Sequence, residues 1–270
     1  MIRLLPVLAS LALVACGQAE PARESTTAPT IVSLNPCTDA ILAEVAGPEQ
    51  LLALSHYSHA PQSTSMNVAK AQQYGVTGGT VEEILALQPD IVVASSFMPP
   101  AARAALDDLG IPVVTFGIAA TISDSHQQIR DLARLAGAED RGERLIARID
   151  RALDSALYDG DPLSAVVWQP SGIVPGDNAL VSAMMRHSGL TSHSAAIGME
   201  QADYLSLEAM LANPPDILLI AGQERSQHHP ALAKLGGTHR AILDSGLLYC
   251  GGPTIIRLLH RLADVRDAAL

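Results

Sequence analysis

The sequence predicts an α/β protein with two similar, doubly wound lobes, joined by one long connecting helix and enclosing a ligand cleft. Three observations support this fold class. A ten-residue segment occurs twice, as EEILALQPDI at residues 82–91 and as EAMLANPPDI at residues 208–217. Apolar runs of strand length alternate with helical patterns in both halves, which is typical of parallel sheets. A long amphipathic helical segment lies between the two copies.

Each copy of the repeat predicts a helix, a turn and a strand. Thr80 and Ser206 provide hydroxyls that can cap a helix N-terminus. Glu82 and Glu208 then place a carboxylate in the first turn, where the helix dipole favours negative charge. A Pro-Asp pair ends each helix, and the apolar run that follows is typical of a buried parallel strand.

The other elements follow from periodicity and from turn residues. In the first half we expect strands at 31–34, 51–55, 91–94 and 113–116 and helices at 38–46 and 101–109. Two helical pieces, separated by Gly137, fill residues 123–156, and the second piece is the expected connector. In the second half we expect strands at 165–168, 217–220 and 247–250 and helices at 178–187, near 238–244 and from 253 onward. An ordinary crossover helix within one domain is the alternative for the connector.

The chain therefore divides into five segments. We expect a lipoprotein signal peptide at 1–15, a flexible tether at 16–29, an N-terminal lobe at 30–122, a helical connector at 123–158 and a C-terminal lobe at 159–270.

The N-terminus predicts export. A short charged start precedes an apolar stretch that ends in Leu13-Val14-Ala15-Cys16, which resembles the bacterial lipobox. A plain secretory signal with a chance cysteine is the alternative. The polar, proline-containing residues that follow are typical of a tether. We expect a monomer in the periplasm or cell envelope, in contact with the membrane only through a lipid on Cys16.

Composition argues against several classes of function. The formal net charge of −11 argues against binding to nucleic acid or to anionic lipid. The sequence contains no phosphate-binding loop, serine-hydrolase elbow, zinc-protease or dinucleotide-binding signature, so we expect neither catalysis nor a cofactor. His56 and His59, together with His228 and His229, could bind a metal, but histidines scattered over loops are more often solvated.

Two cysteines remain after Cys16. Cys37 and Cys250 lie in different halves of the chain. In an exported protein they form either a disulfide, which requires the lobes to touch there, or two free thiols. Metal ligation is a weaker alternative.

The few aromatic residues predict the position of a cleft. Five of them lie at or just after the carboxyl ends of expected strands, namely Tyr57, Phe97, Phe116, Trp168 and Tyr249. Ligands of open parallel sheets bind at this edge, and apolar walls are usual in small-molecule sites. The alternative is that some of these rings serve only local packing.

These features resemble the periplasmic substrate-binding proteins of ABC importers for vitamin B12, iron siderophores and haem. The resemblance rests on the sequence Ile31-Val32-Ser33-Leu34-Asn35-Pro36, on Leu54-Ser55-His56-Tyr57-Ser58 and on the two glutamate-bearing repeats. It implies capture of a ligand between the lobes and docking of Glu82 and Glu208 onto the transmembrane subunits of a permease.

The vitamin B12-binding branch is the most similar, which makes a corrinoid the leading ligand and a ferric siderophore or haem the next. The tryptophans that this branch carries before each glutamate motif are absent, since Val76, Ala202 and Tyr204 stand in those regions. Few arginines follow the expected strands, which argues against an anionic catecholate. We expect the ligand contacts to be Asn35, Pro36, Cys37, Tyr57, Phe97, Phe116, Trp168, Gln169, Tyr204, Tyr249, Cys250 and Gly251.

Two rival functions remain. One is an exported metal carrier or metalloenzyme that uses His56, His59, Cys37 and Cys250. The other is a sensor or scaffold lipoprotein that keeps the fold without transport.

Overall fold

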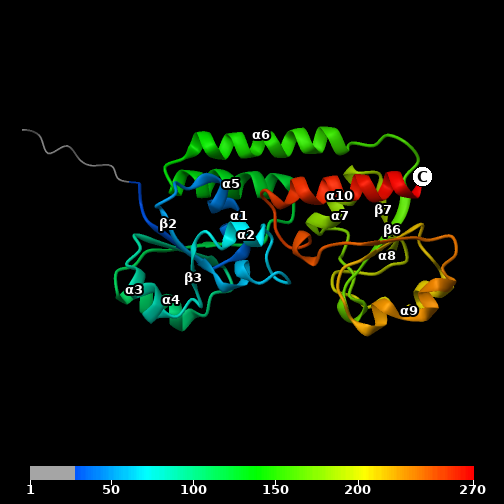
Figure 1. Cartoon of the computed structure of the whole chain (residues 1–270), viewed down its shortest axis with the longest axis horizontal. Helices are drawn as coiled ribbons and strands as arrows, with labels where there is room; N and C mark the ends of the chain where they lie inside the picture. Colours follow the sequence, from blue (N-terminus) through cyan, green and yellow to red (C-terminus); the bar gives the residue numbers. More distant parts are fainter. Residues whose placement is uncertain (1–27) are drawn as a thin grey trace, which may run out of the picture.

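The computed structural model describes residues 28–270, and it contains two parallel sheets, one in each lobe (Figure 1). The N-lobe sheet has the order β3-β2-β1-β4-β5, with strands at Ile31–Ser33 (β1), Leu51–Ser55 (β2), Gly75–Thr77 (β3), Ile91–Ser95 (β4) and Val113–Phe116 (β5). The C-lobe sheet has the order β7-β6-β8-β9, with strands at Leu163–Trp168 (β6), Leu190–Ser192 (β7), Ile217–Ile220 (β8) and His239–Ile242 (β9). Two similar doubly wound lobes are thus confirmed.

Helices cover both faces of each sheet. The N-lobe carries α1 (Pro36–Val45), the 3₁₀ turn η1 (His56–His59), α2 (Val68–Ala71), α3 (Val81–Leu87) and α4 (Pro100–Asp108). The connector consists of α5 (Ile122–Leu135) and α6 (Glu139–Ala156). The C-lobe carries η2 (Pro170–Gly172), α7 (Leu180–His187), α8 (His193–Ala196), α9 (Leu207–Ala212), η3 (Arg225–His228), η4 (Pro230–Lys234), η5 (Ser245–Leu247) and α10 (Thr254–Ala269).

The repeat forms the same structure in both lobes. The hydroxyl of Thr80 accepts the backbone N–H of Glu83 at 3.3 Å, and that of Ser206 accepts the N–H of Ala209 at 3.1 Å. Both predicted caps therefore begin the expected helices, α3 and α9. Each helix leads into a central strand, β4 or β8, that pairs with the first strand of its lobe.

The aspartate of the repeat fixes the start of each lobe's first strand. Asp90 Oδ2 accepts the N–H and the hydroxyl of Thr30, both at 2.7 Å. Asp216 Oδ2 accepts the N–H of Ser164 at 2.8 Å and its hydroxyl at 2.7 Å. These bonds hold the pKa of both carboxyls below the usual range. We call the two arrangements the aspartate clamps.

One large core joins the lobes. It contains buried residues of both sheets together with α1, α5, α6, α7 and α10, while smaller clusters lie under the outer helices of each lobe. Helix α6 runs across the top of both lobes in Figure 1, with α5 and α10 packed beneath it. Leu145, Ile149 and Leu153 are buried on its inner face, as the amphipathic pattern predicts.

Side chains fix α6 to both lobes. At the N-lobe, Arg141 donates to the carbonyl of Val45, and Arg148 pairs with Glu44 at 2.9 Å. At the C-lobe, the ring of His187 bonds the carbonyl of Leu153 at 2.7 Å. Gly137 separates α5 from α6 with φ +61°, a conformation that glycine adopts without strain.

Several expected elements differ from the structure. The strand β9 replaces the helix expected near 238–244, because pairing of β9 with β8 outweighs the local sequence preference. No strand forms at 247–250, since η5 ends at Leu247 and the residues after it form a loop. Asp244 caps η5 by accepting the N–H of Gly246 at 2.9 Å. The short strands β3 and β7 and the short helices α2 and α8 were not expected, since three or four residues carry too little periodicity.

The expected signal peptide, the lipid site Cys16 and nearly all of the tether lie outside the described residues. Within residues 28–270, no helix combines the length and hydrophobicity that crossing a membrane requires.

Candidate ligand-binding cleft

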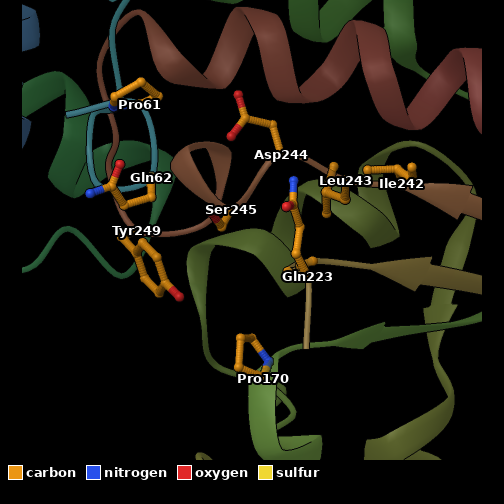
Figure 2. A pocket seen from close by; sticks show the side chains of 11 residues that line it. Pro61, Gln62, Pro170, Gln223, Ile242, Leu243, Asp244, Ser245 and Tyr249 are labelled. Carbon is orange, nitrogen blue, oxygen red and sulfur yellow. The ribbon is translucent and has the colours of Figure 1, made fainter. Parts of the chain in front are cut away.

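A cavity of about 750 Å³ lies between the two lobes. The N-lobe contributes Pro61 and Gln62, from the loop that follows η1, and the rest of the lining comes from the C-terminal half. Figure 2 shows these side chains arranged around one space. The lining residues are Pro61, Gln62, Pro170, Ala221, Gly222, Gln223, Ile242, Leu243, Asp244, Ser245 and Tyr249.

The lining is apolar with neutral polar groups. Prolines and aliphatic side chains form the walls, while the amides of Gln62 and Gln223 and the hydroxyl of Ser245 supply hydrogen-bonding groups. Asp244 is the charged residue among those that line the cavity, and Arg257 pairs with it at 3.4 Å. Such a surface suits a neutral, amphipathic ligand better than a strongly anionic one.

Tyr249 connects the expected and observed sites. Its side chain is 59% exposed, it lines the cavity, and its hydroxyl donates to Gln169 Oε1 at 2.8 Å. Partial burial raises the pKa of the phenol above its usual value, so Tyr249 stays a neutral donor. The structure therefore brings Tyr249 and Gln169 together beside the cleft, although Tyr249 lies in a loop and not after a strand.

Trp168 was expected to contact the ligand, but the structure buries it. Its side chain is only 1% exposed, and its indole N–H donates to the carbonyl of Leu205 at 2.9 Å. The carbonyl of Trp168 in turn accepts the amide of the buried Gln227 at 2.9 Å. Trp168 thus supports the C-lobe wall from behind and offers no surface to a ligand. Phe116 is likewise buried in the large core.

The N-lobe aromatics are exposed but lie outside the cavity lining. Tyr57 is 50% exposed in η1, with its ring 4.0 Å from that of His56 between centroids. Phe97 is 76% exposed in the turn after β4. Tyr204 is also exposed, in the C-lobe segment before α9, where it pairs with Ile173 through an isolated β-bridge. Their contact with a ligand stays a prediction.

A disulfide joins the lobes at Cys37 and Cys250, with 5.0 Å between their Cα atoms. The two thiols are thus neither free nor able to bind a metal, which removes half of the ligand set of the rival metal site. Asn35 caps α1 by accepting the N–H of Cys37 at 2.9 Å, and the carbonyl of Pro36 accepts the hydroxyl of Ser65 at 3.0 Å.

The chain after the disulfide continues to bind the N-lobe. Gly252 donates its N–H to the hydroxyl of Ser125 at 2.7 Å, and Thr254 donates its hydroxyl to the carbonyl of Ser65 at 3.1 Å. Cys250 and Gly251 are consequently buried in this junction. They were expected at the mouth of the cleft, whereas the structure gives them a role in joining the lobes.

Three histidines of the C-lobe line a different cavity. A second cavity of about 720 Å³ shares Gly222, Gln223 and Ile242 with the first and is also lined by His228, His229 and His239. Among residues 28–270, no group of three or more His, Cys, Asp or Glu side chains is arranged to hold a metal ion.

The observed lining also contains residues that the sequence reasoning missed. Ala221, Gly222 and Gln223 are the first three residues after the carboxyl end of β8, so the rule used for the aromatics would have found them. Gln62 was missed because it lies beyond η1 and not at the carboxyl end of a strand, where the sequence placed the cleft.

The two repeat glutamates lie on corresponding surfaces. Glu82 and Glu208 are exposed in the first turns of α3 and α9, and neither side chain forms a hydrogen bond or ion pair with another described residue. In Figure 1, α3 and α9 lie at the lower side of their lobes, away from α6. The neighbouring Glu83 is different, because its carboxylate accepts the hydroxyl of Thr77 at 2.8 Å and the N–H of Gly78 at 2.7 Å.

Known proteins share this architecture. A family model described as periplasmic binding protein matches residues 31–235. The heme-binding protein RhuT from Roseiflexus sp. RS-1, in its apo form, is 24% identical, with a TM-score of 0.70 and coverage of 90% of this chain and 100% of that one. No curated protein sequence matches the chain significantly.

Two proteins of Vibrio cholerae have similar structures. The heme-binding protein HutB is 18% identical, with a TM-score of 0.72 and coverage of 88% of this chain and 98% of that one. The vitamin B12-binding protein BtuF is 18% identical, with a TM-score of 0.67 and coverage of 90% and 98%. At these identities the likeness shows the fold.

Proposed function

Because this chain belongs to the periplasmic binding protein family, we propose that it captures a corrinoid or a ferric chelate between its lobes and delivers it to an ABC permease. The family and its structural neighbours are binding proteins of importers and not enzymes. The observation that supports capture best is the cavity of about 750 Å³ that both lobes line.

The lining favours a corrinoid within this ligand class. A corrinoid presents an apolar macrocycle surrounded by carboxamide groups, which match the prolines and the amides of Gln62 and Gln223. Haem carries two carboxylates and a catecholate complex is strongly anionic, so both call for cationic partners. Among the described residues, no arginine or lysine lines this cavity, although Arg240 lines the neighbouring one.

Delivery is assigned to Glu82 and Glu208. Each carboxylate is exposed on its own lobe and has no partner within the described residues, so both are available to arginines of a permease. We further propose that Cys16 carries the lipid that keeps the protein at the membrane, with the tether between them.

A binding titration tests capture. The intact protein, kept unacylated by Cys16→Ser, is titrated with cyanocobalamin, then with haemin and ferric siderophores, by calorimetry. We expect a Kd near or below about 1 μM for one of them, equivalent to about −8 kcal/mol. Folded protein that binds none of these chelates would refute the ligand class.

An uptake assay tests delivery. Charge reversal in the pair Glu82→Arg and Glu208→Arg should abolish uptake of the bound chelate in cells and leave its Kd unchanged. The matched control reverses two other exposed glutamates, one in each lobe, as Glu49→Arg and Glu200→Arg. Unchanged uptake in the Glu82 and Glu208 variant would favour the rival function of a sensor or scaffold.

A further inference from the structure

One buried carboxylate holds the part of the N-lobe that borders the cavity. Asp39 lies in the first turn of α1, and its side chain is 0% exposed. Its Oδ2 atom accepts the N–H of Ser55 at 3.1 Å, the hydroxyl of Ser55 at 2.7 Å and the hydroxyl of Ser58 at 2.6 Å. Ser55 ends β2 and Ser58 lies in η1, so the three bonds fix the turn on both sides of Tyr57.

This turn leads directly into the cavity wall. The carbonyl of Tyr57 accepts the N–H of Ala60 at 3.2 Å and the hydroxyl of Ser63 at 2.9 Å. Pro61 and Gln62, which line the cavity, lie between these contacts. We call residues 55–62 the cleft rim. Asp39 therefore holds the first half of the segment whose end, at Pro61 and Gln62, lines the cavity.

The fold itself does not require a carboxylate at this place. Helix α7 follows the first strand of the C-lobe as α1 follows that of the N-lobe, and its first turn contains no acidic residue. Burying a carboxylate without a counterion is costly, and Asp39 Oδ1 has no hydrogen-bond partner among the described residues. A costly group that the fold does not need points to a role in the site.

The charge of this carboxyl changes near neutral pH. Burial raises the pKa of Asp39 to about 7, although the bonds from Ser58 and Ser55 act in the opposite direction. An ionised carboxylate accepts stronger hydrogen bonds than a neutral carboxyl. The cleft rim is therefore held more firmly when Asp39 is ionised.

We propose that Asp39 is a positioning residue for ligand binding, whose carboxylate holds the cleft rim in its binding geometry and thereby makes affinity increase with pH. The proposal rests on the proposed function, because it takes the cavity between the lobes as the ligand site. Asp39 itself is buried and acts through Ser55 and Ser58, without touching the ligand.

Other titratable groups near the rim must be distinguished from Asp39. His56 and His59 belong to η1 itself, and a buried nitrogen of His59 has no partner among the described residues. Glu44 on α1 is neutralised by Lys70 and Arg148. Other charged or titratable groups on the elements near α1 and the rim include Asp124 and His126 of α5, Arg141 of α6 and Arg257 of α10.

A ligand-free measurement tests the positioning. The intact protein, with 3-fluorotyrosine incorporated, is followed by ¹⁹F NMR, and Tyr57→Phe assigns the Tyr57 signal. We expect this signal to titrate with a midpoint near the Asp39 pKa of about 7 in the native protein. Because the His56 ring lies against that of Tyr57, the comparison is made in a His56→Gln, His59→Gln background and below the pH at which the fluorinated phenol itself ionises. In this background the signal should still titrate, and it should become independent of pH when Asp39→Asn is added.

Ser58→Ala provides a second variant that keeps the carboxylate. Because the bond from Ser58 lowers the pKa of Asp39, its loss should move the midpoint of the Tyr57 signal to higher pH. A shift to higher pH is expected if Asp39 causes the titration and not if a histidine does. Ser58→Ala therefore identifies the titrating group even where Asp39→Asn does not fold.

The ligand-bound measurement uses cyanocobalamin and haemin as probes. Affinity should be roughly fivefold higher near pH 8 than near pH 6, the equivalent of one net hydrogen bond, and independent of pH in Asp39→Asn. With both η1 histidines replaced, a Tyr57 signal that does not change with pH, or a titration that persists in Asp39→Asn, overturns the proposal. If neither probe binds but the Tyr57 titration behaves as expected, the rim assignment holds and the proposed ligand class fails.

Discussion

The two lobes share the order of their central strands but differ in what connects the last two. In the N-lobe, β4 and β5 are connected through α4, and an additional edge strand, β3, widens the sheet. In the C-lobe, β8 and β9 are connected by a loop that holds the two 3₁₀ turns η3 and η4. Both cavities are lined in part by residues of this C-lobe region.

Comparison of the two lobes distinguishes residues that build the sheets from residues that line or border the cavity. The caps Thr80 and Ser206 and the aspartate clamps recur in both lobes and build the sheets. Gln223 and Tyr249 occur once and line the cavity, while Asp39 occurs once and holds its rim. The caps and clamps that build the sheets are thus repeated, whereas the residues of the proposed ligand site have no counterpart in the other lobe.

The largest expected effect on stability is at Trp168, in contrast to Tyr249, which lines the cavity. Trp168→Ala should lower the free energy of unfolding by about 3–5 kcal/mol, because the indole is buried and hydrogen-bonded. Tyr249→Ala should change it by about 1 kcal/mol or less while weakening ligand binding. Urea unfolding together with calorimetry distinguishes the two, and equal losses of stability would contradict this assignment.

The disulfide should have the next largest effect. Replacing Cys37 and Cys250 by serine, in a Cys16→Ser background, should lower the free energy of unfolding by about 2–5 kcal/mol. The reason is that the unfolded chain loses a cross-link over a long loop. Cys16→Ser alone is the control in urea unfolding. An unchanged midpoint would show that the hydrogen bonds of Ser65 and Ser125 suffice to join the lobes.

Asp39 and the aspartate clamps should respond to pH in opposite directions. The pKa of Asp39 is raised from 3.8 to about 7, so the native state binds the proton more tightly than the unfolded state does. Its contribution to stability is therefore greatest below pH 3.8 and is lost as pH rises to about 7. Asp39→Asn should remove this decline from the stability curve measured by thermal unfolding.

The smallest expected effect compares the two aspartate clamps. Both carboxyls have lowered pKa values, so their contributions are present above pH 3.8 and are lost at lower pH. Asp90→Asn and Asp216→Asn should each lower the urea midpoint at neutral pH by a small and similar amount, because both clamps lie near solvent. A much larger effect of one substitution would mean that the two aspartate clamps contribute unequally to stability.

Much of the fold could be predicted from the sequence because it depends on local signals. The caps at Thr80 and Ser206, the break at Gly137 and the apolar runs at β2 and β5 all depend on a few neighbouring residues. The region after β8 could not be predicted in this way. Whether residues 239–242 form a helix or a strand depends on β8, which offers them a pairing edge.

The site was predictable only in part for a related reason. Tyr249 and Gln169 were expected near the ligand and do lie together at the cleft. The prediction that Trp168 contacts the ligand was wrong, because its position at the end of a strand does not determine on which face of the sheet the ring lies. Whether Cys37 and Cys250 pair could not be decided from the sequence, since pairing depends on how the C-terminal segment crosses to the N-lobe.

The disulfide between the lobes constrains the order in which the protein matures. The bond between Cys37 and Cys250 spans 213 residues, so almost the whole globule lies inside one covalent ring. For an exported chain that emerges N-terminus first, Cys37 reaches the oxidising compartment long before its partner does. Ring closure must therefore be among the last steps of maturation, and until then Cys37 is a thiol exposed to mispairing.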